Sequence, residues 1–139
     1  MIDINWREYW QLRFANPLSD AETLILDQDS YIKELGKKPT SYDDIQGQYT
    51  GLIKIRADKL QSFIDFYQQL DSSAYYDGKD FANMYLTSFI QALINSNWKV
   101  QAVPVTNGWL EVDSVEDLAT YERLLELGQL DHFCRVESL

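Results

Sequence analysis

Helical apolar stripes alternate along this chain with short runs of aliphatic and β-branched residues, and that alternation is the strongest constraint on its fold. The stripes predict four helices, and the short runs predict a hairpin, a single strand and a second hairpin. The predicted order is helix, hairpin, strand, helix, helix, hairpin, helix. This order indicates an α/β or α+β protein with a mixed sheet. The predicted helices cover 6–13, 58–70, 86–95 and 114–127, and the predicted strands 22–27, 31–35, 50–56, 99–105 and 109–112.

Individual residues mark the predicted boundaries of these elements. Asp58 and Ser114 stand where a helix-capping side chain is expected, and the apolar stripe that follows Asp58 should face a sheet. Asn107-Gly108 is the strongest short hairpin turn in the sequence. Pro104 indicates that its strand lies near an edge of the sheet. Gly51, within a predicted strand, indicates a close approach of another backbone.

Length and charge limit the classes of function. The chain has 139 residues, the size of one domain, and its 22 acidic against 12 basic residues give a net charge of −10. That charge disfavours binding to nucleic-acid phosphates and to anionic membranes. No run approaches the ~18 apolar residues of a membrane-spanning helix. We therefore predict a cytoplasmic protein with neither a nucleic acid nor a membrane as partner.

Cys134 and His132 are the only cysteine and the only histidine in the sequence. A single cysteine forms no intramolecular disulfide and cannot complete a zinc site of several thiolates. Two residues apart on a helix, the two side chains would point away from each other. A cysteine–histidine nucleophile is therefore not expected.

Glu111 and Asp113 form the acidic pair whose context suggests chemistry. Random placement of the acids would give about 3.4 pairs at this spacing, so spacing alone carries no weight. This pair, however, lies where a short strand leads into a capped helix, next to fixed backbone dipoles. Paired carboxylates bind Mg²⁺ or act as acid and base. The alternative is the ordinary preference for acids at the start of a helix.

Lys37-Lys38-Pro39 is the one basic cluster of this acidic chain. A pair of lysines after a strand is typical of a solvated turn, because lysine is mostly exposed. The functional alternative is a lysine that contacts a phosphate group inside a pocket.

Four stretches of the sequence resemble the C-terminal half of the NTP-transferase (nucleotidyltransferase) family. The similarity is greatest to its choline-phosphate cytidylyltransferase-like and sugar-phosphate nucleotidyltransferase branch. The Trp-Leu-Glu-Val-Asp string that leads into a capped helix is the most specific part of the resemblance. The matching stretches are 3–22, 47–55, 84–94 and 108–118.

The resemblance implies a partial Rossmann-like nucleotidyltransferase fold of the α/β class, with a mixed sheet flanked by helices. It implies transfer of a nucleotidyl group from an NTP, with CTP favoured, to a phosphorylated small molecule such as phosphocholine or a sugar phosphate. Lys38 would meet the acceptor's phosphate, and Tyr49, Thr50 and Gly51 would lie beside the acceptor. Glu111 and Asp113 would hold Mg²⁺.

One part of the family pattern has no counterpart in the sequence. The six glycines form no glycine-rich phosphate loop. We therefore expect residues 1–139 to be a single, acceptor-binding domain, inactive alone, whose N-terminal nucleotide-binding half is absent. A sheet divided there would have an open edge, which predicts a homodimer or pairing with the missing half. The alternative is a non-catalytic regulatory or assembly domain that acts through protein contacts.

Overall fold

A small mixed sheet forms the centre of the computed structural model, which describes residues 1–135. Strand β1 (Ile2–Asp3) lies between two others, antiparallel to β4 (Gln48–Tyr49) and parallel to β7 (Pro104–Val105). Ile2 is therefore opposite both Tyr49 and Pro104. The predicted mixed sheet and the edge position of Pro104 are confirmed.

Two antiparallel hairpins accompany this sheet. The first, predicted from the sequence, pairs β2 (Leu24–Leu26) with β3 (Ile32–Leu35), and its register shifts between Ile25 and Leu26. The second pairs β5 (Tyr75–Tyr76) with β6 (Lys79–Asp80), in a segment where no strand was predicted. Because each of these strands has only two to four residues, side-chain packing must supply most of the stability.

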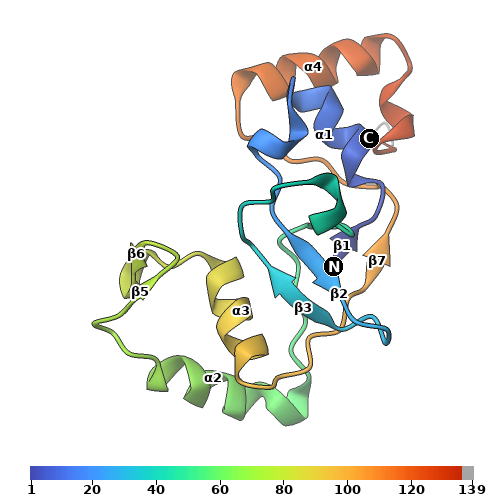
Figure 1. Ribbon diagram of the computed structural model, residues 1–139. Helices are drawn as coiled ribbons and strands as arrows, with labels where there is room; N and C mark the ends of the chain where they lie inside the picture. The colour runs from blue at the N-terminus through green and yellow to red at the C-terminus, as the bar shows by residue number, and fades with distance from the viewer. Residues whose placement is uncertain (136–139) are drawn as a thin grey trace.

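The four predicted helices are all present. They are α1 (Trp6–Arg13), α2 (Leu60–Gln69), α3 (Leu86–Asn95) and α4 (Val115–Glu126). Figure 1 shows α1 and α4 together at one end of the molecule and α2 and α3 at the other, with the β-strands of the centre between them. Within the described residues, no helix is long and apolar enough to cross a membrane. Short 3-10 helices connect the elements: η1 (Pro17–Ser19), η2 (Tyr42–Asp44), η3 (Ala57–Lys59), η4 (Phe81–Asn83) and η5 (Leu130–His132).

Two clusters of buried side chains form the core. The first is largely aromatic and joins α1 to α4: Trp6, Tyr9, Trp10, Ala21, Ile45, Tyr121, Leu124 and Leu130. The second joins the strands to α3: Ile2, Leu24, Ile32, Leu35, Ile90 and Ala102. The first cluster fixes α1 against the segment before α4, and this contact builds the site described below.

The strand predicted over 50–56 is wrong. β4 ends at Tyr49, and the chain then runs extended and unpaired to η3. Gly51 does adopt a left-handed φ of +80°, but a Cβ added there would meet no atom within 4 Å, so no close approach requires it. The segment is not a strand because none of the strands at residues 1–135 lies beside it.

Helix α2 also differs from its prediction, since it faces another helix and not a sheet. Its rings Phe63 and Phe66 pack against Phe89 of α3 and against Trp98. None of its residues is buried. Asp58 does not cap it, but pairs with Arg56.

The predicted second hairpin is wrong, although its turn is present. Asn107 and Gly108 have left-handed φ angles of 55° and 86°, as a two-residue hairpin turn requires. No strand follows at 109–112. The Trp109 indole donates a hydrogen bond to the Asp3 carboxylate at 2.9 Å, as does the Asn107 main-chain N–H at 3.2 Å. These two bonds direct the chain towards α1, and β7 pairs with β1 instead.

Candidate functional site: an arginine–carboxylate cluster

Arg13, at the end of α1, is the centre of the candidate site. Its side chain is 1% exposed and forms ion pairs with three carboxylates from around the start of α4. Nη2 lies 2.7 Å from Asp113 Oδ2, Nε lies 2.9 Å from Asp117 Oδ1, and Nη1 contacts Glu111. Three carboxylates around one guanidinium leave a formal charge of −2. The hydrogen bonds to these carboxylates raise the pKa of Arg13 against the opposing effect of its burial, so the cation is permanent.

Asp117 joins this cluster to the N-terminus of α4. It accepts main-chain N–H bonds from Asp113 and Ser114, both at 3.1 Å, and the Ser114 hydroxyl accepts from the Asp117 N–H at 3.0 Å. This reciprocal capping box confirms Ser114 as the predicted cap. The hydrogen bond from Arg13 outweighs burial and lowers the pKa of Asp117 to about 2. Asp117 is therefore charged under all ordinary conditions.

Two buried tyrosines hold the main chain of Glu111. The Glu111 N–H donates to the Tyr9 hydroxyl at 2.8 Å, and the Tyr121 hydroxyl donates to the Glu111 carbonyl at 3.0 Å. The two hydroxyls lie 2.7 Å apart and hydrogen bond to each other, and the Tyr9 hydroxyl also lies 3.4 Å from the Glu111 carbonyl, so these contacts close into a ring. Burial raises the pKa of both tyrosines, which keeps the ring neutral.

Glu111 and Asp113, the predicted metal ligands, lie side by side on Arg13 but differ in environment. The Glu111 side chain is 35% exposed and that of Asp113 is 70% exposed. Burial raises the pKa of Glu111, and the hydrogen bond from Arg13 only partly offsets this effect. The sequence therefore placed the two acids together correctly, but it gave no indication that a buried cation holds them.

A hollow of about 200 Å³ opens beside this cluster. Its rim is acidic and is made by the end of α1, the residue after η1 and the first turn of α4. A compact polar group fits such a volume. The lining residues are Arg13, Phe14, Asp20, Asp113, Ser114, Glu116, Asp117 and Thr120.

Lys38, the predicted phosphate-contacting residue, does not line this hollow but bonds the residue that precedes one of its lining residues. Its side chain is exposed, and Nζ donates a hydrogen bond to the carbonyl of Ser19, the last residue of η1. The next residue, Asp20, lines the hollow and accepts a 3.0 Å bond from the Trp10 indole. Lys37 instead pairs with Glu34 at 2.6 Å. The two neighbouring lysines thus have different partners, and Lys38 bonds the residue next to Asp20 of the hollow.

Tyr49, Thr50 and Gly51 are not brought to this hollow. Tyr49 packs against the core cluster that joins the strands to α3. Its buried hydroxyl has no hydrogen-bond partner among residues 1–135, and burial raises its pKa. Thr50 bonds the carbonyl of Met1, and Gly51 is exposed. The acceptor-binding role of these three residues stays a prediction.

The metal role of Glu111 and Asp113 also stays a prediction, and the arrangement does not favour it. In the part of the chain that the structure describes, no group of three His, Cys, Asp or Glu side chains is placed to hold a metal ion. Both predicted ligands already bind the Arg13 guanidinium.

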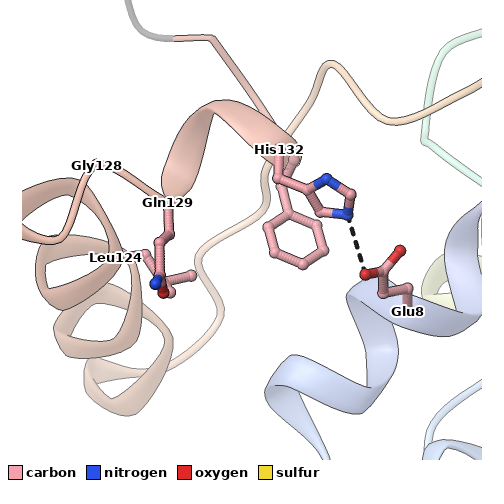
Figure 2. A pocket seen from close by; sticks show the side chains of 6 residues that line it. Glu8, Leu124, Gly128, Gln129 and His132 are labelled. Atoms are coloured by element: carbon pink, nitrogen blue, oxygen red, sulfur yellow. Dashed lines mark hydrogen bonds and ion pairs between the residues drawn. The ribbon is translucent and has the colours of Figure 1, made fainter.

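A second hollow, of about 430 Å³, lies between α1 and η5 (Figure 2). Glu8 of α1 contacts His132 Nε2 at 2.9 Å across its mouth. Cys134 does not share a site with this histidine, since its main-chain N–H simply continues the turn of η5. This hollow is open. The ion pair at its mouth is exposed at both residues and joins α1 to η5. We assign no further chemistry to it.

Sequence analysis missed Arg13 and Asp3 as site residues. Arg13 lies on the same helical face as Trp6, Tyr9 and Trp10, and a cation in an aromatic stripe was the signal that could have found it. Asp3 is fully buried and accepts N–H bonds from Asn5, Asn107 and Trp109. A carboxylate in a two-residue strand gives no such signal, because two of its three donors, Asn107 and Trp109, lie about a hundred residues away.

Comparison with known proteins gives the class to which this chain is similar. No protein-family model matches it, and no solved structure matches it. Among curated proteins, it is similar to a nucleotidyltransferase of the cytidylyltransferase type. This relative is the CTP:phosphoglutamine cytidylyltransferase of Campylobacter jejuni subsp. jejuni serotype O:2. The two are 48% identical over 118 residues, which make up 85% of this chain and 46% of the relative.

The chain thus spans less than half the length of that relative. The similarity supports the predicted relationship to nucleotidyltransferases at the level of the cytidylyltransferase type. The mixed α/β structure, with small sheets and helices, is consistent with it.

Proposed function

We propose that this chain supplies the acceptor side of a nucleotidyltransferase that transfers CMP from CTP to a phosphorylated small molecule. The 48% identity to a cytidylyltransferase carries the proposal. In this reaction a phosphate oxygen of the acceptor attacks the α-phosphorus of CTP, and pyrophosphate leaves. Positioning and charge stabilisation supply most of the catalysis in such transfers, and no covalent nucleophile is needed.

Lys38 is the residue that we assign to the acceptor's phosphate. It is an exposed cation whose ammonium group bonds only the main-chain carbonyl of Ser19, the residue before Asp20 of the acidic hollow. A phosphate dianion would be a stronger partner for its ammonium group than this neutral carbonyl. Lys37 is already neutralised by Glu34.

The hollow beside Arg13 is the natural place for the non-phosphate part of the acceptor. Its acidic rim would attract a cationic group such as the quaternary ammonium of phosphocholine or the amino group of phosphoglutamine. The uncharged hydroxyls of a sugar phosphate would gain less from that rim. The related enzyme is named for phosphoglutamine, so we place an amino-acid or choline phosphate ahead of a sugar phosphate as acceptor.

Mg²⁺, when bound to a nucleotidyltransferase, supplies positive charge at the phosphates. In this chain, Glu111 and Asp113 are occupied by Arg13, so we assign them the role of holding Arg13 and the start of α4. Turnover further requires a nucleotide-binding polypeptide. In the relative, the 54% of the length that lies outside the match is long enough to form one. The partial Rossmann-like architecture predicted from the resemblance would be completed by it.

A ligand panel with paired lysine variants tests the proposal. The chain is titrated calorimetrically with phosphoglutamine, phosphocholine and a sugar 1-phosphate. We expect one amino-bearing acceptor to bind, and Lys38→Ala to weaken it by about tenfold, which corresponds to about 1.4 kcal/mol. Lys37→Ala is the matched control and should leave the affinity within about twofold.

Two results would contradict this assignment. Equal weakening by the two lysine variants would show only a general effect of charge. Binding of none of the three acceptors, by a chain that unfolds cooperatively, would favour the alternative of a non-catalytic assembly domain. The exposed apolar surface described next is the observation that keeps this alternative open.

A further inference from the structure

Several large apolar side chains are exposed along the segment 50–69. It comprises the unpaired extended stretch 50–56, η3 and α2. Leu52 is 60% exposed, Ile53 44%, Leu60 51% and Ile64 39%. Leu60 and Ile64 are one helical turn apart and lie on the same face of α2. We call these exposed apolar side chains the 50–69 surface.

Part of the main chain of this surface, at 53–55, is also unpaired. Thr50, Ile53 and Ile55 are β-branched, the composition of a strand, yet the stretch lies outside every sheet. Within residues 1–135, the amides and carbonyls of 53–55 make no hydrogen bond, while Leu52 accepts only from the amino group of Met1. Extended backbone of this kind is a template on which another polypeptide can add a strand.

The accessible surface of the chain is larger than expected for a monomer of its mass. The accessible surface of the chain is 9278 Å². A monomeric protein of 16.2 kDa is expected to expose about 7,450 Å². The excess, about 1,800 Å², exceeds the about 800 Å² that each partner contributes to a standard protein–protein interface.

The charge of the 50–69 surface distinguishes it from the rest of the molecule. Three cations, Lys54, Arg56 and Lys59, outnumber two carboxylates, Asp58 and Asp65, in a chain whose net charge is −10. An acidic partner that docks here therefore avoids the electrostatic repulsion that it would meet on the rest of the negatively charged molecule. The segment also borders β4, the edge strand of the central sheet, so an added strand would extend that sheet.

We propose that the 50–69 surface is the docking site of the nucleotide-binding polypeptide of the same nucleotidyltransferase, which adds a strand along 50–56 and covers the outer face of α2. The proposal rests on the proposed function for the identity of this partner. The relative has enough additional sequence for such a partner, because 54% of its length lies outside the match. The exposed apolar side chains, the unpaired backbone of 53–55 and the charge locate the contact independently of catalysis.

Co-expression tests the location. The tagged chain is produced together with an untagged polypeptide made of the relative's residues outside the matched region, and the complex is analysed by light scattering. We expect a 1:1 complex. Ile53→Asp and Ile64→Asp should each reduce the recovered partner at least tenfold. The matched control, Leu125→Asp, changes a leucine of α4 that is 54% exposed and should not affect recovery.

Hydrogen exchange of the complex gives a second readout. The amides of 53–55 should become protected at least tenfold relative to the chain alone. Three results would overturn the proposal: no complex with the wild-type chain, a complex that survives both aspartate variants, or a homodimer of the chain that those variants disrupt. None of these measurements uses CTP or an acceptor. A complex that forms at this surface but transfers no CMP would refute the proposed function and leave the docking site standing.

Discussion

Arg13 shows how a single residue can determine the character of a site. Its guanidinium is almost fully buried, and three carboxylates surround it, two of which sequence analysis assigned to a metal. Aromatic rings of Tyr9, Trp10 and Phe14 lie within 6 Å of its central carbon and provide an apolar wall. The planar guanidinium donates hydrogen bonds in fixed directions, so it can bind several carboxylates at once in this position.

Removal of this cation should be costly. We expect Arg13→Ala to lower the free energy of unfolding by about 3–5 kcal/mol, because it leaves the partly buried acids without a counter-charge. Urea denaturation monitored by tryptophan fluorescence measures the change. Arg56→Ala, which breaks an exposed pair with Asp58, is the control and should cost at most about 1 kcal/mol. Equal losses in the two variants would show that Arg13 is not a structural centre.

The pH dependence of stability should report Asp117. Its folded-state pKa of about 2 lies below the ordinary value of 3.8, so its ionised form stabilises the fold above about pH 4. This contribution is lost as the pH falls through 2. We expect the wild-type protein to lose about 2 kcal/mol from this group between pH 6 and pH 2. Asp117→Asn should remove that part of the dependence, measured by urea titration at each pH. The raised pKa of Glu111 acts with the opposite sign in the range just above its ordinary value.

At the scale of elements, helix α4 is defined by its own sequence and α2 is not. Ser114 and Asp117 form a complete capping box, and Gly128 follows the helix in a left-handed conformation, with a φ of 66°. Helix α2 has no side-chain cap and no buried residue. Its position depends on aromatic contacts with α3 and Trp98.

This difference predicts unequal effects of two similar substitutions. Ser114→Ala should lower the free energy of unfolding by about 1 kcal/mol, because it removes an N-cap hydrogen bond. Asp58→Ala, at the cap position that the sequence suggested for α2, should leave the free energy of unfolding nearly unchanged, because only an exposed ion pair is lost. Thermal denaturation compares the two variants. A larger loss for Asp58→Ala would contradict the observed capping.

Sequence predicted the helices well because each depends on a local apolar stripe. It also predicted the β2–β3 hairpin, in which the pairing segments are neighbours along the chain. It failed for 50–56 and 109–112, where strand formation depends on a partner that lies elsewhere. In the site, it selected Glu111 and Asp113 from local context. The sequence did not identify Arg13 as the partner of these two acids, because the ion pairs join residues about a hundred positions apart.

At the scale of the whole molecule, stability is distributed unevenly between its two ends (Figure 1). The end that contains α1 and α4 has a continuous buried aromatic cluster, ion pairs and a hydrogen-bond ring. The other end, from 50 to 86, contributes no residue to either buried core cluster. It carries eight of the fifteen exposed large apolar side chains of the described residues.

This imbalance predicts local unfolding of the 50–86 segment. Amides of α2 should exchange with solvent at least tenfold faster than those of α1, because few buried contacts must break to open α2. Hydrogen exchange followed by mass spectrometry of peptides from each helix tests this. Similar protection of the two helices would show that the aromatic contacts of α2 suffice to make the molecule a single cooperative unit.

The fold should slow deamidation at the Asn107-Gly108 turn. Deamidation begins when the main-chain nitrogen of the following residue attacks the asparagine side chain and ammonia leaves. Here the Gly108 N–H donates to the Phe133 carbonyl at 2.7 Å, and the Asn107 amide donates to the His132 carbonyl at 2.9 Å. Both reacting groups are thereby held by the segment that follows α4. We expect storage in urea to convert Asn107 to aspartate and isoaspartate much faster than storage in buffer, as peptide mass spectrometry would show. Prolonged unfolding would therefore leave a lasting covalent change beside the buried Asp3.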